Sequence, residues 1–145
     1  MKPLTLTLLA LSLVVPVSLR AGHPDISGVW HLDTAASTFA SDPTPSAANL
    51  SISKDGKRIH IAESFTYPNG EKSREYEWRT DDRFHPVDGP SSGSVIARWD
   101  GDMLAGDRRG EKGTESIRMM LRDPSTLTQS IARNGQQITL IWRRR

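Results

Sequence analysis

The sequence contains no cysteine. No disulfide can therefore stabilise the fold, and the chain has to rely on a core of its own. Beyond its first residues it also lacks any apolar run of the roughly 20 residues that a membrane-spanning helix needs. The sequence has no pattern of a long amphipathic helix, no coiled-coil pattern and no repeat of about 20 to 50 residues. These absences leave a single globular domain built from short elements.

The sequence also lacks the motifs of several catalytic and metal sites. It has no G-x-S-x-G nucleophile elbow and no P-loop spacing. Zinc needs three or four convergent ligands, and no paired His or Cys spacing supplies them. His31 and His60 are expected on the solvent face of strands. We therefore predict no catalytic residue, no metal site and no cofactor, and the chain is not expected to be an enzyme.

The first 21 residues have the features of a secretory signal peptide. Lys2 provides a positive start, an apolar run extends from Leu4 to Val17, and Ala21 offers a small residue for cleavage. We expect residues 1–21 to be removed and residues 22–145 to form one exported domain, periplasmic or secreted. No cysteine follows the leader, so a lipid anchor is not expected.

The net charge excludes nucleic acid as an expected partner. The full chain has 19 Lys and Arg against 17 Asp and Glu, which gives a formal net charge of +2. Lys2 and Arg20 both lie in the leader, so the domain that remains carries 17 groups of each sign. The basic pI of the full chain is therefore partly a property of the leader and does not indicate nucleic-acid binding.

Alternation of apolar and polar residues dominates the rest of the sequence. Gly28–Leu32 is the first strand signal, and a connection with one or two helical turns is expected over residues 33–40. From Asn49 onward, short alternating segments are separated by turn dipeptides, namely Asp55-Gly56, Asn69-Gly70, Asp100-Gly101 and Asn134-Gly135. Residues 107–113 are expected to form a charged loop. The pattern predicts an all-β fold, an up-and-down antiparallel meander of eight to nine strands closed into a barrel.

The first strand has a distinctive composition. Gly28 lacks a Cβ, so another group can approach the backbone there. Trp30 lies two residues further on and shares a sheet face with Gly28 and Leu32. We expect Trp30 to be a structural side chain that closes one end of the barrel.

Several motifs resemble those of a known group of barrels. Gly28-Val29-Trp30 matches the G-x-W that opens lipocalins and, in a similar form, avidin-type barrels. The chain is most similar to small secreted lipocalin-like proteins of bacteria, through Trp30-His31-Leu32-Asp33 followed by Ser37-Thr38-Phe39, through the hairpin Trp99-Asp100-Gly101-Asp102-Met103-Leu104, and through Ile141-Trp142-Arg143. The chain is shorter than a typical lipocalin and lacks its C-terminal helix.

The resemblance implies a barrel with a small internal cavity and no settled activity. It also implies that an arginine near the end of the barrel packs across Trp30. Arg143 and Arg144 are both candidates, and Arg143 is taken with Gly28 and Trp30 as a structural residue.

The inward apolar face is the predicted ligand site. Under strict alternation it includes three aromatic side chains and two methionines, an adaptable lining for an apolar guest. These five predicted ligand-binding residues are Tyr76, Trp78, Trp99, Met103 and Met119. Plain core packing is the competing interpretation, because an eight-stranded barrel is only just wide enough for its own side chains or one small ligand.

The function expected from the sequence is non-enzymatic binding of a small apolar or amphipathic molecule. One alternative is an interaction module with a filled core that contacts a partner protein in the envelope through Ile96, Met120 and Ile141. The last is a barrel enzyme that uses the acidic cluster between Glu71 and Asp82. Cross-strand charge pairing explains that cluster without catalysis.

Overall fold

The computed structural model describes residues 22–87 and 93–145, which form ten β-strands in a single antiparallel sheet. The expected signal peptide, residues 1–21, lies outside the described residues. No helix occurs within the described ranges. The strands are β1 (Gly28–Leu32), β2 (Ala47–Asp55), β3 (Arg58–Tyr67), β4 (Gly70–Arg79), β5 (Phe84–Val87), β6 (Gly93–Asp100), β7 (Met103–Gly110), β8 (Gly113–Asp123), β9 (Thr126–Arg133) and β10 (Gln136–Arg144).

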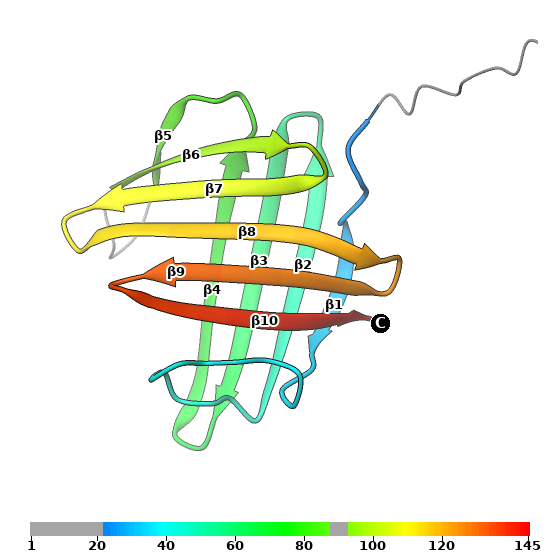
Figure 1. Cartoon of the computed structure of the whole chain (residues 1–145), viewed down its shortest axis with the longest axis vertical. Coiled ribbons are helices and arrows are strands. Elements are labelled where there is room, and N and C mark those ends of the chain that lie inside the picture. Colours follow the sequence, from blue (N-terminus) through cyan, green and yellow to red (C-terminus); the bar gives the residue numbers. More distant parts are fainter. Residues whose placement is uncertain (1–21, 88–92) are drawn as a thin grey trace, which may run out of the picture.

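The sheet folds round on itself as a meander barrel. The hydrogen-bonded order is β4-β3-β2-β1-β10-β9-β8-β7-β6-β5, so the first strand pairs with the last and every other pair is adjacent in sequence. Figure 1 shows β1–β4 standing roughly upright behind β6–β10, which cross in front of them. β4 and β5 are the two ends of the hydrogen-bonded order, and β4 packs against β5 and β6. The all-β antiparallel meander is confirmed, with ten strands instead of eight to nine.

Alternation along the strands places the core inside the barrel. β2 buries Ala48, Leu50 and Ile52 and exposes the residues between them. The largest fully buried side chains include Trp30 and Trp142. Trp30 donates a hydrogen bond from Nε1 to the carbonyl oxygen of Ile26 at 3.1 Å, which satisfies the one polar atom of its ring.

The connection between β1 and β2 differs from the expectation. Residues 33–40 form turns and an isolated bridge, not helical turns. The backbone of Thr38 exchanges hydrogen bonds with that of Thr139, at 2.8 and 3.0 Å. This pairing with β10 supplies the backbone partners that a helix would otherwise provide, so tertiary contact overrides the local preference. In Figure 1 the connection runs below β10.

The expectation of a charged loop at residues 107–113 is also wrong. β7 continues to Gly110 and β8 begins at Gly113, with a tight turn between them. Arg108 lies directly opposite Glu115 in this pair of strands. Opposite charges at facing positions stabilise a sheet, so a charged sequence is compatible with strand here.

Candidate ligand cavity

A cavity of about 650 Å³ lies at the end of the barrel where the β1–β2 connection, the β3–β4 turn and the β9–β10 hairpin meet. Its volume falls within the range typical of small-molecule sites. Fifteen residues line it, namely Phe39, Asp42, Pro43, Thr44, Phe65, Tyr67, Pro68, Asn69, Lys72, Ser73, Arg74, Ile131, Arg133, Ile138 and Leu140. We refer to this space as the cavity.

One wall of the cavity is apolar and continuous with the core. Ile131, Ile138 and Leu140 are buried members of the core cluster, and Phe39 and Phe65 pack against that cluster. Phe65, Ile131, Ile138 and Leu140 share a face because they lie at alternate, inward positions of β3, β9 and β10, and Phe39 joins them from the β1–β2 connection. The apolar wall can therefore receive a hydrocarbon group without exposing it to water.

A buried carboxylate, Glu63, does not line the cavity itself but holds the lining residue Arg74 in place. Its side chain is inaccessible to solvent and receives hydrogen bonds from Arg74 Nε at 2.5 Å, from Tyr76 Oη at 3.0 Å and from Gln129 Nε2 at 3.2 Å. Gln129 in turn accepts a hydrogen bond from Trp142 Nε1 at 2.9 Å. Every polar member of this network thus has a partner, as buried polar groups require.

The network shifts the ionisation of its members. Burial, reinforced by the neighbouring Glu63 carboxylate, raises the pKa of Tyr76 well above its ordinary value. Burial by itself would lower the pKa of Arg74, but the Glu63 carboxylate more than offsets this, and that pKa lies above its ordinary value. Tyr76 therefore remains a neutral donor and Arg74 a permanent cation.

A second row of charges crosses the facing wall of the barrel. Arg108, Glu115 and Arg133 lie opposite one another on β7, β8 and β9. Glu115 is 5% exposed, and its two oxygens lie 3.4 Å from Arg133 Nη1 and 3.9 Å from Arg108 Nε. The other terminal nitrogen of Arg133 contacts the carboxylate of Asp42, which belongs to the β1–β2 connection.

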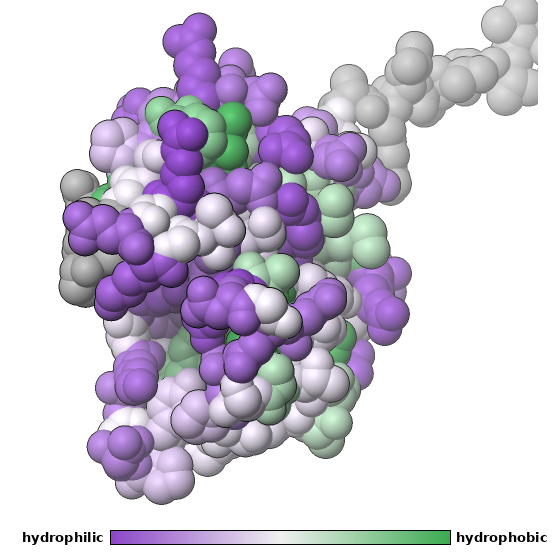
Figure 2. All heavy atoms as spheres, turned by 60° about the vertical axis from the view of Figure 1, so that its left-hand side comes forward, coloured by the Kyte–Doolittle hydropathy of each residue, from purple (hydrophilic) through white to green (hydrophobic). Residues whose placement is uncertain are grey.

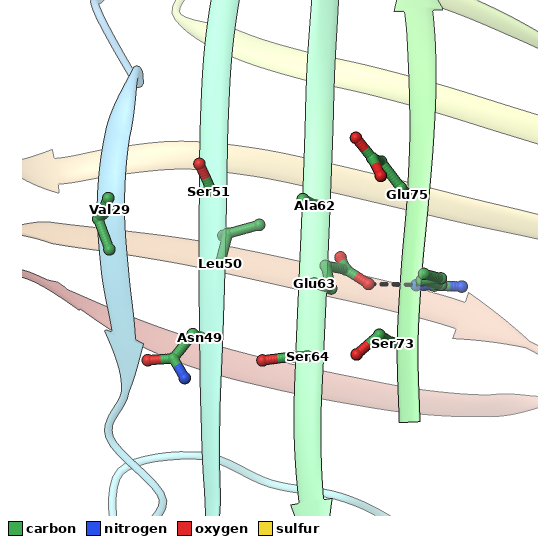
Figure 3. A pocket seen from close by; sticks show the side chains of 10 residues that line it. Val29, Asn49, Leu50, Ser51, Ala62, Glu63, Ser64, Ser73 and Glu75 are labelled. Atoms are coloured by element: carbon green, nitrogen blue, oxygen red, sulfur yellow. Dashed lines mark hydrogen bonds and ion pairs between the residues drawn. The ribbon is translucent and has the colours of Figure 1, made fainter. Parts of the chain in front are cut away.

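A further hollow, of about 420 Å³, is a groove on the outer surface of β1–β4. Figure 3 shows Asn49, Ser51, Ala62 and Ser64 along it, together with the dashed ion pair of Glu63. Its width comes from the short side chains of this face. A third hollow, of about 390 Å³, lies where β4 meets β5 and is lined by Tyr76 and by charged residues of β4.

None of the five predicted ligand-binding residues lines the cavity. Trp78 and Met119 are buried in the core cluster, and Tyr76 packs against it. Trp99 also packs against that cluster, and its ring stacks on His23 with centroids 4.6 Å apart. For Met103 the predicted orientation is wrong, because it alternates with fully buried Leu104 and therefore lies on the opposite face of β7.

The structure shows which of the two candidate arginines packs across the ring of Trp30. The guanidinium of Arg144 lies 4.2 Å from the centroid of the Trp30 ring. Arg143, the structural residue chosen from the sequence, points the other way and forms an ion pair with Asp33 at 3.0 Å. Of the two candidates left open by the sequence, Arg144 is therefore the one that packs across Trp30, since successive residues of a strand face opposite sides and only Arg144 shares the face of Trp30.

The other surface features expected from the sequence are only partly present. Met120 is exposed and Ile96 is half-buried, but Ile141 is only 7% exposed. The β1–β2 connection runs beside Ile141, where the backbone N–H of Asp33 donates to its carbonyl oxygen at 2.8 Å. The expected outward apolar patch is therefore not continuous. In the acidic cluster, Glu75 pairs with His60, Glu77 with Arg79 and Asp81 with His85.

Sequence reasoning missed the charged residues of the cavity lining and the buried Glu63 that pairs with one of them, Arg74. Glu63 follows Ile59 and Ile61 at the same alternate positions of β3, so it occupies an inward position in an otherwise apolar series. That register was the available signal, because an acid in such a position must find a buried partner. No signal within the sequence connects Arg133 to Asp42.

The described residues show neither a metal cluster nor a membrane-spanning helix. No group of three His, Cys, Asp or Glu side chains within residues 22–87 and 93–145 could hold a metal ion. In the same ranges no helix has the length and apolar composition needed to cross a bilayer. Figure 2 shows hydrophilic side chains over much of the face in view, with apolar groups between them.

The barrel is similar to several solved structures of ligand-binding proteins. A "REP1-NXSQ fatty acid transporter" matches with a TM-score of 0.66 at 14% identity, over 83% of this chain and 96% of the other. Human cRBP IV matches with a TM-score of 0.66 at 15% identity, over 84% and 99%. Fatty-acid-binding protein 1 of Echinococcus granulosus matches with a TM-score of 0.64 at 9% identity, over 82% and 96%. At these identities the likeness establishes the fold, a lipocalin and fatty-acid-binding-protein-like barrel.

Sequence comparison adds nothing to this. No family model and no curated protein sequence matches the chain.

Proposed function

We propose that this protein binds a small apolar or amphipathic molecule in the cavity and catalyses no reaction. The observation that carries the proposal is the composition of that space. Its apolar wall, formed by Phe39, Phe65, Ile131, Ile138 and Leu140, adjoins a polar side on which Arg74 and Arg133 are held by acidic partners. A mostly apolar hollow with a few oriented polar groups is the usual form of a small-molecule site.

The neighbouring structures favour the same function. Two of those named above are described as a fatty acid transporter and a fatty-acid-binding protein. Proteins with this fold are thus associated with lipid-like ligands, and the cavity here provides the space for one. This supports the ligand class proposed for the present chain.

The test is a titration with the neutral fluorescent probe N-phenyl-1-naphthylamine. Saturable binding at one site is expected. Phe39→Ala and Phe65→Ala should each weaken it about tenfold, because each removes apolar contact area from the wall. Phe84→Ala is the matched control, since Phe84 is exposed on β5 and does not line the cavity. Absence of saturable binding, or equal effects of all three variants, would contradict the proposal.

We also propose that the protein acts after export, in the periplasm or outside the cell. The leader composition of residues 1–21 motivates this, as argued from the sequence. N-terminal sequencing of the protein from its native host should find a chain that begins near Gly22. An intact Met1 terminus in the cytosol would refute export.

A further inference from the structure

We infer that the ligand carries one acidic head group, and that this group replaces the carboxylate of Asp42 on Arg133. Asp42 would then be a built-in competitor that sets the affinity for acidic ligands. The inference rests on the proposed function, because it concerns the same cavity. It goes further by naming the head-group chemistry and the two residues that recognise it.

The two partners of Arg133 differ in how firmly they are held. Glu115 lies directly opposite Arg133 on β8 and is buried. Asp42 belongs to the connection between β1 and β2 and reaches Arg133 across 91 residues of sequence. A buried acid on a central strand cannot leave without exposing an unpaired charge, whereas an acid on a surface connection can move into water. Asp42 is therefore the exchangeable partner.

The solvent exposure of Asp42 and Arg133 indicates that an acidic ligand can replace the Asp42 carboxylate with only a small loss of stability. The side chains of Asp42 and Arg133 are 32% and 37% exposed, and both line the cavity. Ion pairs at this level of exposure contribute about 1 kcal/mol or less to stability. An incoming acid that also buries an apolar tail gains more than the Asp42 carboxylate loses.

The charges around the cavity favour an acid over a neutral group. Its lining contains the cations Lys72, Arg74 and Arg133 and the single anion Asp42. Arg74 is already paired with Glu63. Among the ion pairs of the described ranges none involves Lys72. Once Asp42 withdraws, the lining holds three cations and no anion, so an acidic group in its place lowers the excess of positive charge, whereas a neutral group does not.

Two side chains of the β1–β2 connection, Phe39 and Asp42, together resemble an amphiphile, with one apolar and one acidic group. The backbone N–H of Asp42 donates to the carbonyl oxygen of Phe39 at 3.0 Å, which closes a turn with both side chains in the cavity lining. The turn thus places an aromatic ring among the apolar wall residues and a carboxylate on Arg133. An acid with a hydrocarbon tail would make the same two contacts.

The experiment compares three probes with a common twelve-carbon chain: dodecanoate, monododecyl phosphate and dodecanol. Their affinities are measured by isothermal titration calorimetry on the full domain, for the unaltered protein and for Asp42→Asn. We expect Asp42→Asn to raise the affinity for the acidic probes about fivefold and to leave dodecanol unchanged. The two acidic probes distinguish a carboxylate from a phosphate head group, because the natural class should gain more.

Three further variants make the result specific. Asp33→Asn alters an acid on the same connection whose partner is Arg143 and which does not line the cavity, so no affinity should change. Arg133→Gln should abolish the preference for acids over dodecanol while dodecanol still binds, and Arg133→Lys should restore part of it.

The outcomes separate the inference from the function on which it rests. An unchanged affinity for both acids in Asp42→Asn would overturn the inference, as would an equal gain for dodecanol. Either result leaves the proposed function intact, provided that dodecanol binds. If none of the three probes binds the unaltered protein, the proposed function itself fails.

Discussion

The guanidinium of Arg144 lies over the ring of Trp30, 4.2 Å from its centroid, and closes one end of the barrel. Its nitrogens donate to three backbone carbonyls, those of Pro124 at 2.9 Å, Ser27 at 2.6 Å and Asp25 at 3.3 Å. One side chain thereby joins the segment before β1, the turn between β8 and β9, and the indole of the first strand. The cation–π contact and the hydrogen bonds act together at this end.

Replacing Arg144 by Ala should lower the free energy of unfolding by about 2 kcal/mol, since it removes the cation–π contact and the three donors. Arg143→Ala is the matched control. Its ion pair with Asp33 is on the surface, so the loss should stay under about 1 kcal/mol. Urea denaturation followed by tryptophan emission measures both. Equal losses would show that Arg144 has no special structural role.

A side chain at position 28 should disturb the same contact. Gly28 has a φ of +135°, and a Cβ added there would lie 2.7 Å from Arg144 Nη1. We expect Gly28→Ala to destabilise by about 1–3 kcal/mol, from backbone strain and displacement of the guanidinium. The double variant Gly28→Ala with Arg144→Ala should cost less than the sum of the single variants. Simple additivity would mean that the two residues do not interact.

Truncation of Trp30 should be far more costly than truncation of Trp99. Trp30 is fully buried, so Trp30→Ala should cost about 3–5 kcal/mol. Trp99 is only half-buried and stacks on His23, so Trp99→Ala should cost clearly less. Thermal and urea unfolding of the two variants give the comparison. Unchanged melting of Trp30→Ala would contradict its place in the core.

The two methionines of the predicted lining, Met103 on β7 and Met119 on β8, test which faces of these strands are buried. Met119 is fully buried, so Met119→Ala should cost about 2–5 kcal/mol. Met103 lies on the opposite face from Leu104, so Met103→Ala should cost less than about 1 kcal/mol. A one-residue shift in the register of β7 would exchange its two faces and make Met103→Ala costly as well. Equilibrium unfolding in urea decides between them.

Stability should fall at alkaline pH because of Tyr76. Its pKa in the folded protein is raised well above the ordinary value of 10.0, by burial and by the Glu63 carboxylate. The unfolded chain releases the phenolic proton near that value, whereas the folded protein retains it. The stabilisation is therefore complete below about pH 10 and is lost progressively as the pH rises further.

The chain has two tyrosines, which makes this measurable. Absorbance at the tyrosinate band should show one tyrosine that titrates only as the protein unfolds, and this phase should disappear in Tyr76→Phe. Tyr67→Phe, which removes the other phenolic hydroxyl, should retain it. If Tyr67→Phe abolished the late phase instead, the assignment to Tyr76 would be wrong.

The strands and their turns could be predicted from the sequence because they depend on local chemistry. The alternation in β2 and the Asp55-Gly56 turn after it are sufficient to specify a hairpin with one buried face. The same reasoning failed at residues 33–40, where pairing of Thr38 with Thr139 supplies the backbone bonds. It also failed at residues 107–113, where Glu115 on the next strand faces Arg108.

The sequence by itself determined an all-β meander with an inward apolar face and a buried Trp30, because period-two alternation and turn residues act over a few positions. Only the tertiary structure decided where the barrel is hollow, which arginine covers Trp30, and which acid meets Arg133. Those features join residues as distant as Asp42 and Arg133, or Glu63 and Gln129. Their positions depend on how the sheet curls and where β1 meets β10, and no local pattern encodes the distance between such side chains.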